Sequence, residues 1–85
     1  MRVYVSSVLH SYTGGRTQVE AAGVTILDVL ADLDRQFPGL RFRVLDEQDR
    51  LRPHLRIFVG VEQEKNLHAQ VGGQELHLLH ALSGG

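Results

Sequence analysis

The feature that most constrains the fold of this 85-residue chain is one amphipathic helix, predicted over residues 26–37. Its apolar side chains recur at helical spacing, and they are Ile26, Val29, Leu30, Leu33 and Phe37. Thr25 stands at the N-cap position, and Asp28 follows three residues later as a variant of the capping box. Pro38-Gly39 ends the helix, because the residue before proline resists helical geometry and glycine suits the exit. A helix with a single apolar face must bury that face against another element.

Two strands are predicted before the helix. In residues 2–9, Val3 and Val5 alternate with polar and aromatic side chains, and residues 16–21 form a second, shorter strand. The run Ser11-Tyr12-Thr13-Gly14-Gly15 between them is a turn signal. Two strands so closely linked favour an antiparallel hairpin.

Further strands are predicted after the helix. Residues 55–59 are rich in β-branched and aromatic side chains, and residues 75–82 form the last apolar run. A brief edge strand is expected at residues 67–71, beyond a polar connection at residues 60–66. Residues 40–45 fit either a short extended piece or a helical turn.

The order of hairpin, helix and three strands predicts an α+β domain in which one main helix packs on one face of a mixed sheet of four to five strands. If the first and last strands are adjacent and parallel at the centre of that sheet, the fold is a β-grasp. We expect a single domain over residues 1–82, followed by a flexible tail, residues 83–85.

The composition excludes several classes of function. The charges nearly balance, at 9 Lys and Arg against 10 Asp and Glu, so no basic field is available to bind nucleic acid. There is no cysteine, which excludes disulfides, thiolate metal sites and a cysteine nucleophile. No stretch resembles a signal peptide or reaches the roughly 18 apolar residues of a membrane span. We therefore expect a cytoplasmic protein with neither nucleic acid nor membrane as a partner.

The sequence given ends in Ser83-Gly84-Gly85, directly behind the last apolar run. Glycine has no Cβ, so such an end can pass through a channel too narrow for other residues. A terminus of this kind can enter another protein's active site, where its own carboxylate becomes the reactant. Small-residue ends are also typical of a frayed terminus, so the rest of the chain decides between the two interpretations.

The element order and this ending resemble the ubiquitin-like sulfur carriers, which include the small subunit of molybdopterin synthase and the thiamin-pathway sulfur carrier protein. Residues 76–85, LHLLHALSGG, are similar in register to ubiquitin's own ending, LHLVLRLRGG. Residues 51–59 look like the family's pre-strand and central strand. The segments 60–62 and 72–75 depart from the family's usual turns, and both lie in connections.

The resemblance implies a carrier or co-substrate rather than an enzyme, or the non-catalytic small subunit of a synthase. An activating enzyme of the ubiquitin-activating type would adenylate the Gly85 carboxylate with ATP, and sulfur would then convert it to a thiocarboxylate. The thiocarboxylate would donate its sulfur to a synthase subunit in cofactor or metabolite biosynthesis. Gly84 and Ser83 would thread the reacting end into these partners. The carrier itself would bind no cofactor and no metal.

Alternation along the last strand predicts two faces. Leu76 and Leu78 share one face, which by analogy with the family packs on the helix, so His77 and Leu79 point outward. The predicted partner-binding residues are Phe58, His77, Leu79 and Leu82. For Leu79, a place in the core is an equally good interpretation at this point. His77 and His80 are three residues apart, which places them on opposite faces of a strand and argues against a metal site.

Two other functions remain open. In a ubiquitin-like protein modifier, a substrate lysine rather than sulfide would attack the activated Gly85. Lys65 is the only lysine, which disfavours chains of the ubiquitin kind. Ala81 and Ser83 stand where ubiquitin has arginines, which argues against activating enzymes of the eukaryotic type. The last alternative is a plain interaction domain that binds through its exposed sheet edge.

Overall fold

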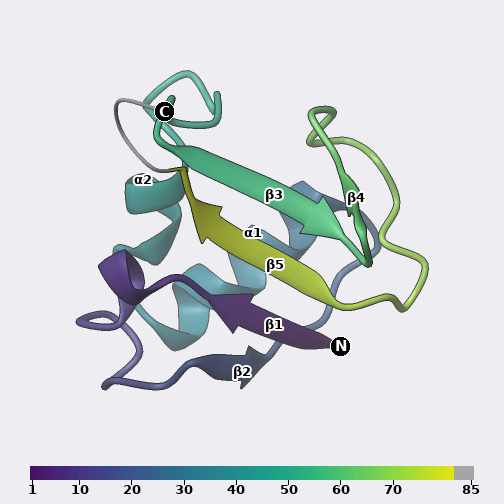
Figure 1. Cartoon of the computed structure of the whole chain (residues 1–85). Coiled ribbons are helices and arrows are strands. Elements are labelled where there is room, and N and C mark those ends of the chain that lie inside the picture. Colours follow the sequence, from purple (N-terminus) through teal and green to yellow (C-terminus); the bar gives the residue numbers. More distant parts are fainter. Residues whose placement is uncertain (82–85) are drawn as a thin grey trace.

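The computed structural model describes residues 1–81, and it places five strands in one mixed sheet with the helices on one face (Figure 1). The elements in chain order are β1 (Arg2–Val5), the 3₁₀ helix η1 (Ser7–Leu9), β2 (Gln18–Glu20), α1 (Ile26–Gln36), α2 (Leu40–Val44), β3 (Leu55–Val59), β4 (Glu62–Gln63) and β5 (Leu76–His80). The predicted main helix, first hairpin and central strand are all present.

The strand order across the sheet is β2-β1-β5-β3-β4. β1 and β5 lie side by side and parallel, with Val3 opposite Leu76 and Val5 opposite Leu78. All other strand pairs are antiparallel. The condition stated for a β-grasp, parallel pairing of the first and last strands at the centre of the sheet, is therefore met, and the fold is a β-grasp.

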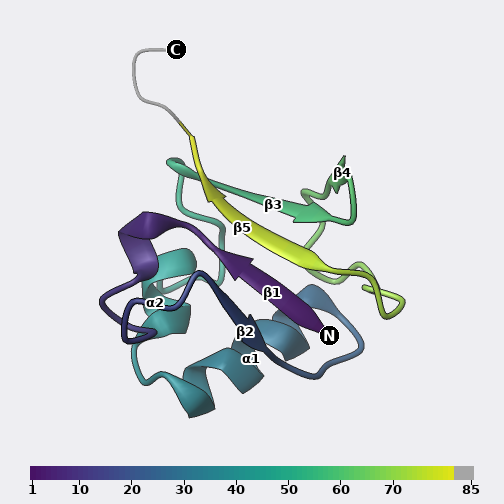
Figure 2. The same ribbon diagram turned by 60° about the horizontal axis from the view of Figure 1, so that its bottom comes forward.

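The core lies between the sheet and α1, which crosses beneath it (Figure 2). The helix contributes Ile26, Val29, Leu30 and Leu33, and the three central strands contribute Val3, Val5, Ile57, Leu76 and Leu78. Each of these side chains is almost fully buried, and full burial of one such side chain stabilises a fold by about 1.5–3 kcal/mol. Phe37, which was predicted on the same helix face, is half-buried and packs against the rim of this core.

Both hydrogen bonds of the predicted capping box are formed at the start of α1. The Asp28 backbone N–H donates to Thr25 Oγ1 at 3.2 Å, and the Thr25 N–H donates to Asp28 Oδ2 at 3.2 Å. These bonds satisfy two backbone donors that the first helical turn leaves unpaired. The bond from Thr25 also holds the pKa of the Asp28 carboxyl below its ordinary value.

The first two strands are shorter than predicted. The strand expected over residues 2–9 ends at Val5, because the chain then turns into η1 and buries Leu9 beneath the sheet. The strand expected over residues 16–21 is paired only over Gln18–Glu20. Burial of Leu9 is a tertiary effect that the local alternation of side chains does not reveal.

Residues 40–45, for which two conformations were open, form the helical turn α2. Asp34 at the end of α1 provides the cap, since its Oδ1 accepts hydrogen bonds from the N–H groups of Gly39 and Arg41 at 3.1 and 3.2 Å. Gly39 has a φ of 94°, which favours glycine, and this conformation lets α2 start at the next residue, Leu40.

The prediction of an edge strand at residues 67–71 is wrong. This segment makes a single bridge, between Gln70 and Thr25, and crosses the start of α1. Its carbonyl groups accept hydrogen bonds from the first amides of the helix, Ile26 N–H to Ala69 O and Leu27 N–H to Leu67 O, both at 3.1 Å. The edge strand is instead β4, which lies within the predicted polar connection and pairs with the end of β3.

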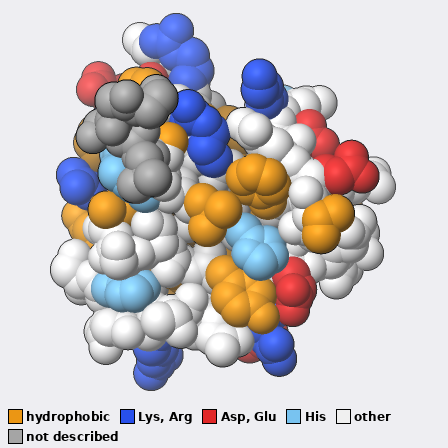
Figure 3. Space-filling model, in the orientation of Figure 1, with side chains coloured by type: hydrophobic (Ala, Val, Ile, Leu, Met, Phe, Trp, Pro, Cys, Tyr) orange, Lys and Arg blue, Asp and Glu red, His pale blue; other side chains and the backbone are white. Residues whose placement is uncertain are grey.

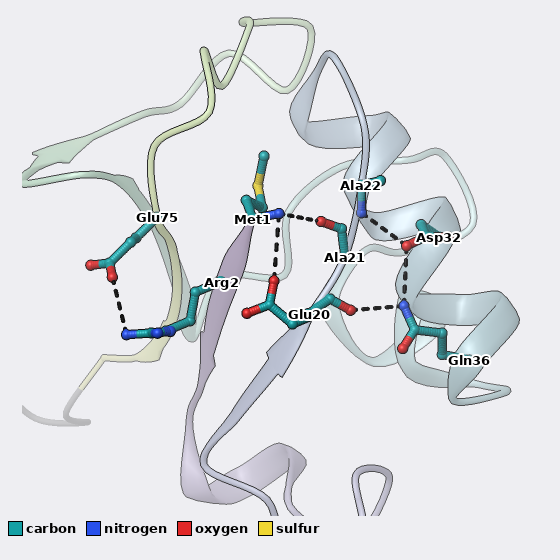
Figure 4. A network of polar contacts seen from close by, with 8 residues as sticks. All are labelled: Met1, Arg2, Glu20, Ala21, Ala22, Asp32, Gln36 and Glu75. Atoms are coloured by element: carbon teal, nitrogen blue, oxygen red, sulfur yellow. Dashed lines mark hydrogen bonds and ion pairs between the residues drawn. The ribbon is translucent and has the colours of Figure 1, made fainter.

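Polar contacts also tie the hairpin to α1 (Figure 4). Asp32 Oδ2 accepts hydrogen bonds from the Ala22 N–H at 3.0 Å and from Gln36 Nε2 at 3.1 Å, and the carboxylate also pairs with Arg35. Gln36 Nε2 donates in turn to the Glu20 carbonyl at 2.9 Å. The bond from Ala22 is the main reason that the pKa of Asp32 lies below its ordinary value.

We expect Thr25→Ala to lower the free energy of unfolding by about 1 kcal/mol, because it removes the N-cap of α1. Urea denaturation followed by circular dichroism measures the change. Thr17→Ala, at an exposed position in the hairpin, is the matched control and is expected to change stability by no more than about 0.5 kcal/mol. Equal losses in both variants would contradict the role given to the cap.

We expect the free energy of unfolding of Asp32→Asn to fall less on acidification than that of the wild-type chain. The folded-state pKa of Asp32 is lowered, so its stabilising contribution is present above the unfolded pKa of about 3.9 and is lost as the pH falls through the folded value. Urea midpoints between about pH 7 and pH 3 measure this, and the advantage of the wild-type chain should shrink toward the acid end. Glu62→Gln, at an exposed carboxylate, is the control. A constant difference between wild type and Asp32→Asn over that range would contradict the assignment.

Candidate functional site

The face of the sheet opposite α1 carries a row of aromatic rings. Tyr4 on β1, His77 on β5 and Phe58 on β3 are direct neighbours across the three central strands. The rings of Tyr4 and His77 are stacked, with their centroids 4.7 Å apart and their planes at 11°. Such stacking holds the imidazole of His77 against the phenol ring of Tyr4.

Leu79 extends this row along β5. It lies on the same side of the sheet as His77, opposite Arg56 on β3, and 40% of its surface is exposed. The structure therefore settles the open alternative for Leu79, because the core positions of β5 are Leu76 and Leu78. We call Tyr4, Phe58, His77 and Leu79 the outer patch.

Figure 3 views this face directly. Hydrophobic and histidine side chains gather over the central strands, and most of the acidic and basic side chains lie toward the rim. At one end of the patch, Arg2 Nη1 lies 3.7 Å from Glu75 Oε2, and the Tyr4 hydroxyl donates to the same oxygen at 3.4 Å. An exposed apolar centre with a charged rim is typical of a surface that binds another protein.

Three of the predicted partner-binding residues, Phe58, His77 and Leu79, are brought together by the fold. Tyr4 was missed, although the alternation of Val3 and Val5 toward the core already placed it on the opposite face. What the alternation could not reveal is that β1 pairs with β5 and so stacks Tyr4 on His77.

The last described residue leaves the sheet at the end of its central strand. Beyond β5, the Ala81 N–H donates to the His54 carbonyl at 2.8 Å, so the chain is still held beside the segment that leads into β3. The remaining predicted site residues lie outside the described residues and stay predictions, and they are Leu82, Ser83, Gly84 and Gly85.

The histidines on β5 lie on the two faces of the sheet, as predicted. His77 belongs to the outer patch, whereas His80 lies next to His54. Within residues 1–81, no three His, Cys, Asp or Glu side chains form a group that could hold a metal ion. None of the helices in this part of the chain is long and apolar enough to cross a membrane.

Comparisons of the sequence and the fold with known proteins identify the family of this chain. No protein-family model matches the chain. It is 28% identical over 89 residues to the sulfur carrier protein CysO of Mycobacterium tuberculosis, with 98% of this chain and 96% of that protein covered. It also matches a chain in the crystal structure of the Amycolatopsis orientalis BexX/CysO complex at 31% identity and a TM-score of 0.88, covering 99% of this chain and 98% of that one. The chain belongs to the ubiquitin-like sulfur carrier family.

Similarity within this family extends to a protein named as a modifier. The chain is 29% identical to the small archaeal modifier protein 1 of Haloferax volcanii, with a TM-score of 0.73, covering 100% of this chain and 98% of that one. The predicted resemblance to ubiquitin-like sulfur carriers is therefore confirmed, and the β-grasp is the fold that these relatives share.

The two faces of β5 are expected to differ sharply in their contribution to stability. Leu78→Ala creates a cavity in the core and should lower the free energy of unfolding by about 2–5 kcal/mol. Leu79→Ala, one residue further along, changes an exposed side chain and should cost at most about 0.5 kcal/mol. Urea denaturation of both variants measures the difference, and similar losses would contradict the assignment of Leu79 to the surface.

Proposed function

We propose that this chain is a sulfur carrier whose Gly85 carboxylate is activated with ATP by a partner enzyme and converted to a thiocarboxylate. The observation that carries the proposal is the similarity over nearly the whole chain to the sulfur carrier protein CysO. The Gly84-Gly85 ending and the apolar outer patch support it, because a carrier needs a reacting end and a surface for its partners.

The proposed chemistry begins with a poor acyl donor, since the oxyanion of a carboxylate is a poor leaving group. The Gly85 carboxylate attacks the α-phosphate of ATP, pyrophosphate leaves, and an acyl-adenylate forms. Hydrosulfide then attacks the carbonyl carbon, and AMP leaves with the electron pair of the broken C–O bond. The product is a thiocarboxylate, whose sulfur can be passed on without release of free sulfide.

In this scheme the chain is a reactant rather than a catalyst. The carrier has no cysteine, and none is needed, because the sulfur is held on the C-terminal carbonyl carbon. The partner enzyme supplies ATP and the groups that activate the carboxylate. We propose that the chain itself binds no cofactor and acts in the cytoplasm.

We propose that the outer patch, together with Leu82, binds the partner proteins. A protein interface has an apolar centre in which aromatic side chains are enriched, and Tyr4 and Phe58 provide such a centre here. One relative is described in a BexX/CysO complex, which supports docking of this chain onto a partner protein. The β-grasp domain, residues 1–82, would bind the partner while the tail, residues 83–85, enters its active site. Ser83 and Gly84 fit this role because their small size lets the backbone pass a narrow channel.

The direct test of activation is ATP–pyrophosphate exchange catalysed by the cognate activating enzyme with this chain as substrate. The wild-type chain is expected to support exchange, and a chain that lacks Gly84 and Gly85 is expected to support none. Circular dichroism of the shortened chain checks that the domain remains folded. Equal exchange with both chains would contradict the proposed role of Gly85.

Docking through the outer patch is tested separately. Leu79→Asp buries a charge at the proposed interface and is expected to lower kcat/KM for exchange at least about tenfold, or about 1.4 kcal/mol. Val61→Asp is the matched control, because Val61 is 94% exposed in the turn between β3 and β4 and lies outside the patch. Equal effects of the two substitutions would argue against the patch as the docking surface.

The similarity to the small archaeal modifier protein 1 supports a second candidate function, attachment of Gly85 to a lysine of another protein. The two functions share the adenylation step and differ in the nucleophile that follows it. When sulfide is left out and candidate substrate proteins are present, a modifier would form covalent conjugates with them. A chain that is activated but forms no conjugates would be a carrier only. A chain that keeps its biological activity without Gly84 and Gly85 would be a plain interaction domain.

A further inference from the structure

Two histidines that are 26 positions apart in the sequence meet where the central strands end. His54 lies in the turn before β3, and His80 is the last residue of β5. Their ring centroids are 5.5 Å apart, and the ring planes cross at 60°. Both residues are exposed.

The backbone holds these two residues together independently of their side chains. His80 pairs with Leu55 in the antiparallel ladder of β3 and β5, and the Ala81 N–H donates to the His54 carbonyl at 2.8 Å. The two Cα positions are therefore fixed by strand pairing, and only the side-chain torsions remain to be set. A ligand that bridges the rings would have little backbone entropy to overcome.

The spacing of the rings fits a bridging metal cation. With a metal–nitrogen bond of about 2.0–2.1 Å, the centre of an imidazole ring lies about 3.2 Å from the bound metal. Two such rings at an angle of about 110–120° around a metal have centres about 5.2–5.5 Å apart. The 5.5 Å between His54 and His80 agrees with this range.

We propose that His54 and His80 form a two-histidine site for a divalent transition-metal cation, against the expectation from the family resemblance that the chain binds no metal. Each neutral imidazole would donate the lone pair of one ring nitrogen, and water would complete the coordination. Nitrogen ligands of this kind suit Cu²⁺, Ni²⁺ and Zn²⁺, and Cu²⁺ forms the strongest complexes of the three. Two protein ligands leave positions open, so the site also has room for a further ligand from solution.

Two arginines close to His54 in the sequence are engaged with backbone carbonyl groups. The guanidinium of Arg52 donates through Nε to the Phe42 carbonyl at 2.8 Å. Arg56 donates through Nη1 to the carbonyls of Pro53 and Leu55 at 2.7 and 2.8 Å. Cu²⁺ is the most sensitive probe of the histidine pair, because it forms the strongest complexes with nitrogen ligands of this kind.

The site is independent of the proposed sulfur chemistry, although it precedes Gly85 by only five residues in the sequence, at His80. The outer patch is separate from it, since His77 and His80 lie on opposite faces of β5. Tests of metal binding therefore need neither the activating enzyme nor a reactive terminus, and failure of either proposal leaves the other standing.

The test is titration of the purified chain with CuCl₂, followed by isothermal calorimetry and by the NMR signals of the histidine rings. We expect one Cu²⁺ to bind and the ring signals of His54 and His80 to broaden first. His54→Gln and His80→Gln should each weaken binding about tenfold or more, because a single imidazole loses the advantage of chelation.

His68→Gln is the matched control, since His68 is also exposed but lies in the segment that crosses the start of α1. It should bind Cu²⁺ as the wild-type chain does. Circular dichroism of each variant checks that the fold is kept. Unchanged affinity in both His54→Gln and His80→Gln would overturn the proposal, as would broadening that begins at other histidines or at the terminal amine.

Discussion

The parallel pairing of β1 with β5 is the interaction on which the rest of this structure depends. It joins segments near the two ends of the described chain, with Val3 opposite Leu76 and Val5 opposite Leu78. These four side chains belong to the same buried core cluster as the apolar residues of α1. The residues between them, Tyr4 and His77, are stacked on the other face. One register therefore determines both the buried core and the outer patch, because a shift of one residue would exchange the two faces.

This pairing also explains the arrangement of the remaining elements. Parallel neighbours need a long connection, and here the hairpin strand β2, the helices, β3 and β4 all lie between β1 and β5. β3 then pairs with the free side of β5 along its full length, from Leu55 opposite His80 to Val59 opposite Leu76. The central position of β5 means that the chain leaves the sheet from its middle. A reacting terminus that follows β5 would thus be carried by the central strand of the sheet.

The parts of the fold that could be predicted from the sequence are those that local patterns determine. The apolar spacing of α1 and its Thr25 capping box can be recognised within a dozen neighbouring residues. The alternation of side chains in β3 and β5 can also be recognised without knowledge of a distant partner. The failures all depend on contacts between distant segments. Residues 67–71 look like a strand, yet their carbonyl groups bind the first amides of α1. β4 is too short and too polar to be recognised without its partner β3.

The same distinction applies to the candidate sites. Alternation alone placed His77 and Leu79 outward, and the fold brought Phe58 beside His77. The stacking of Tyr4 and the meeting of His54 with His80 depend on which strands are neighbours, so spacing along the chain could not reveal them. The roles predicted for Leu82 and for the tail, residues 83–85, rest on the sequence and the relatives, since these residues lie outside the described part of the chain.

The central claim is that the chain carries sulfur on the carbonyl carbon of Gly85. The most direct measurement is the intact mass of the chain after reaction with its activating enzyme, ATP and sulfide, followed by fragmentation to locate the change. The account predicts an ATP-dependent replacement of one oxygen by one sulfur, confined to the C-terminal fragment that contains Gly85. A mass that stays the same after adenylation in the presence of sulfide, or sulfur located anywhere else in the chain, would contradict it.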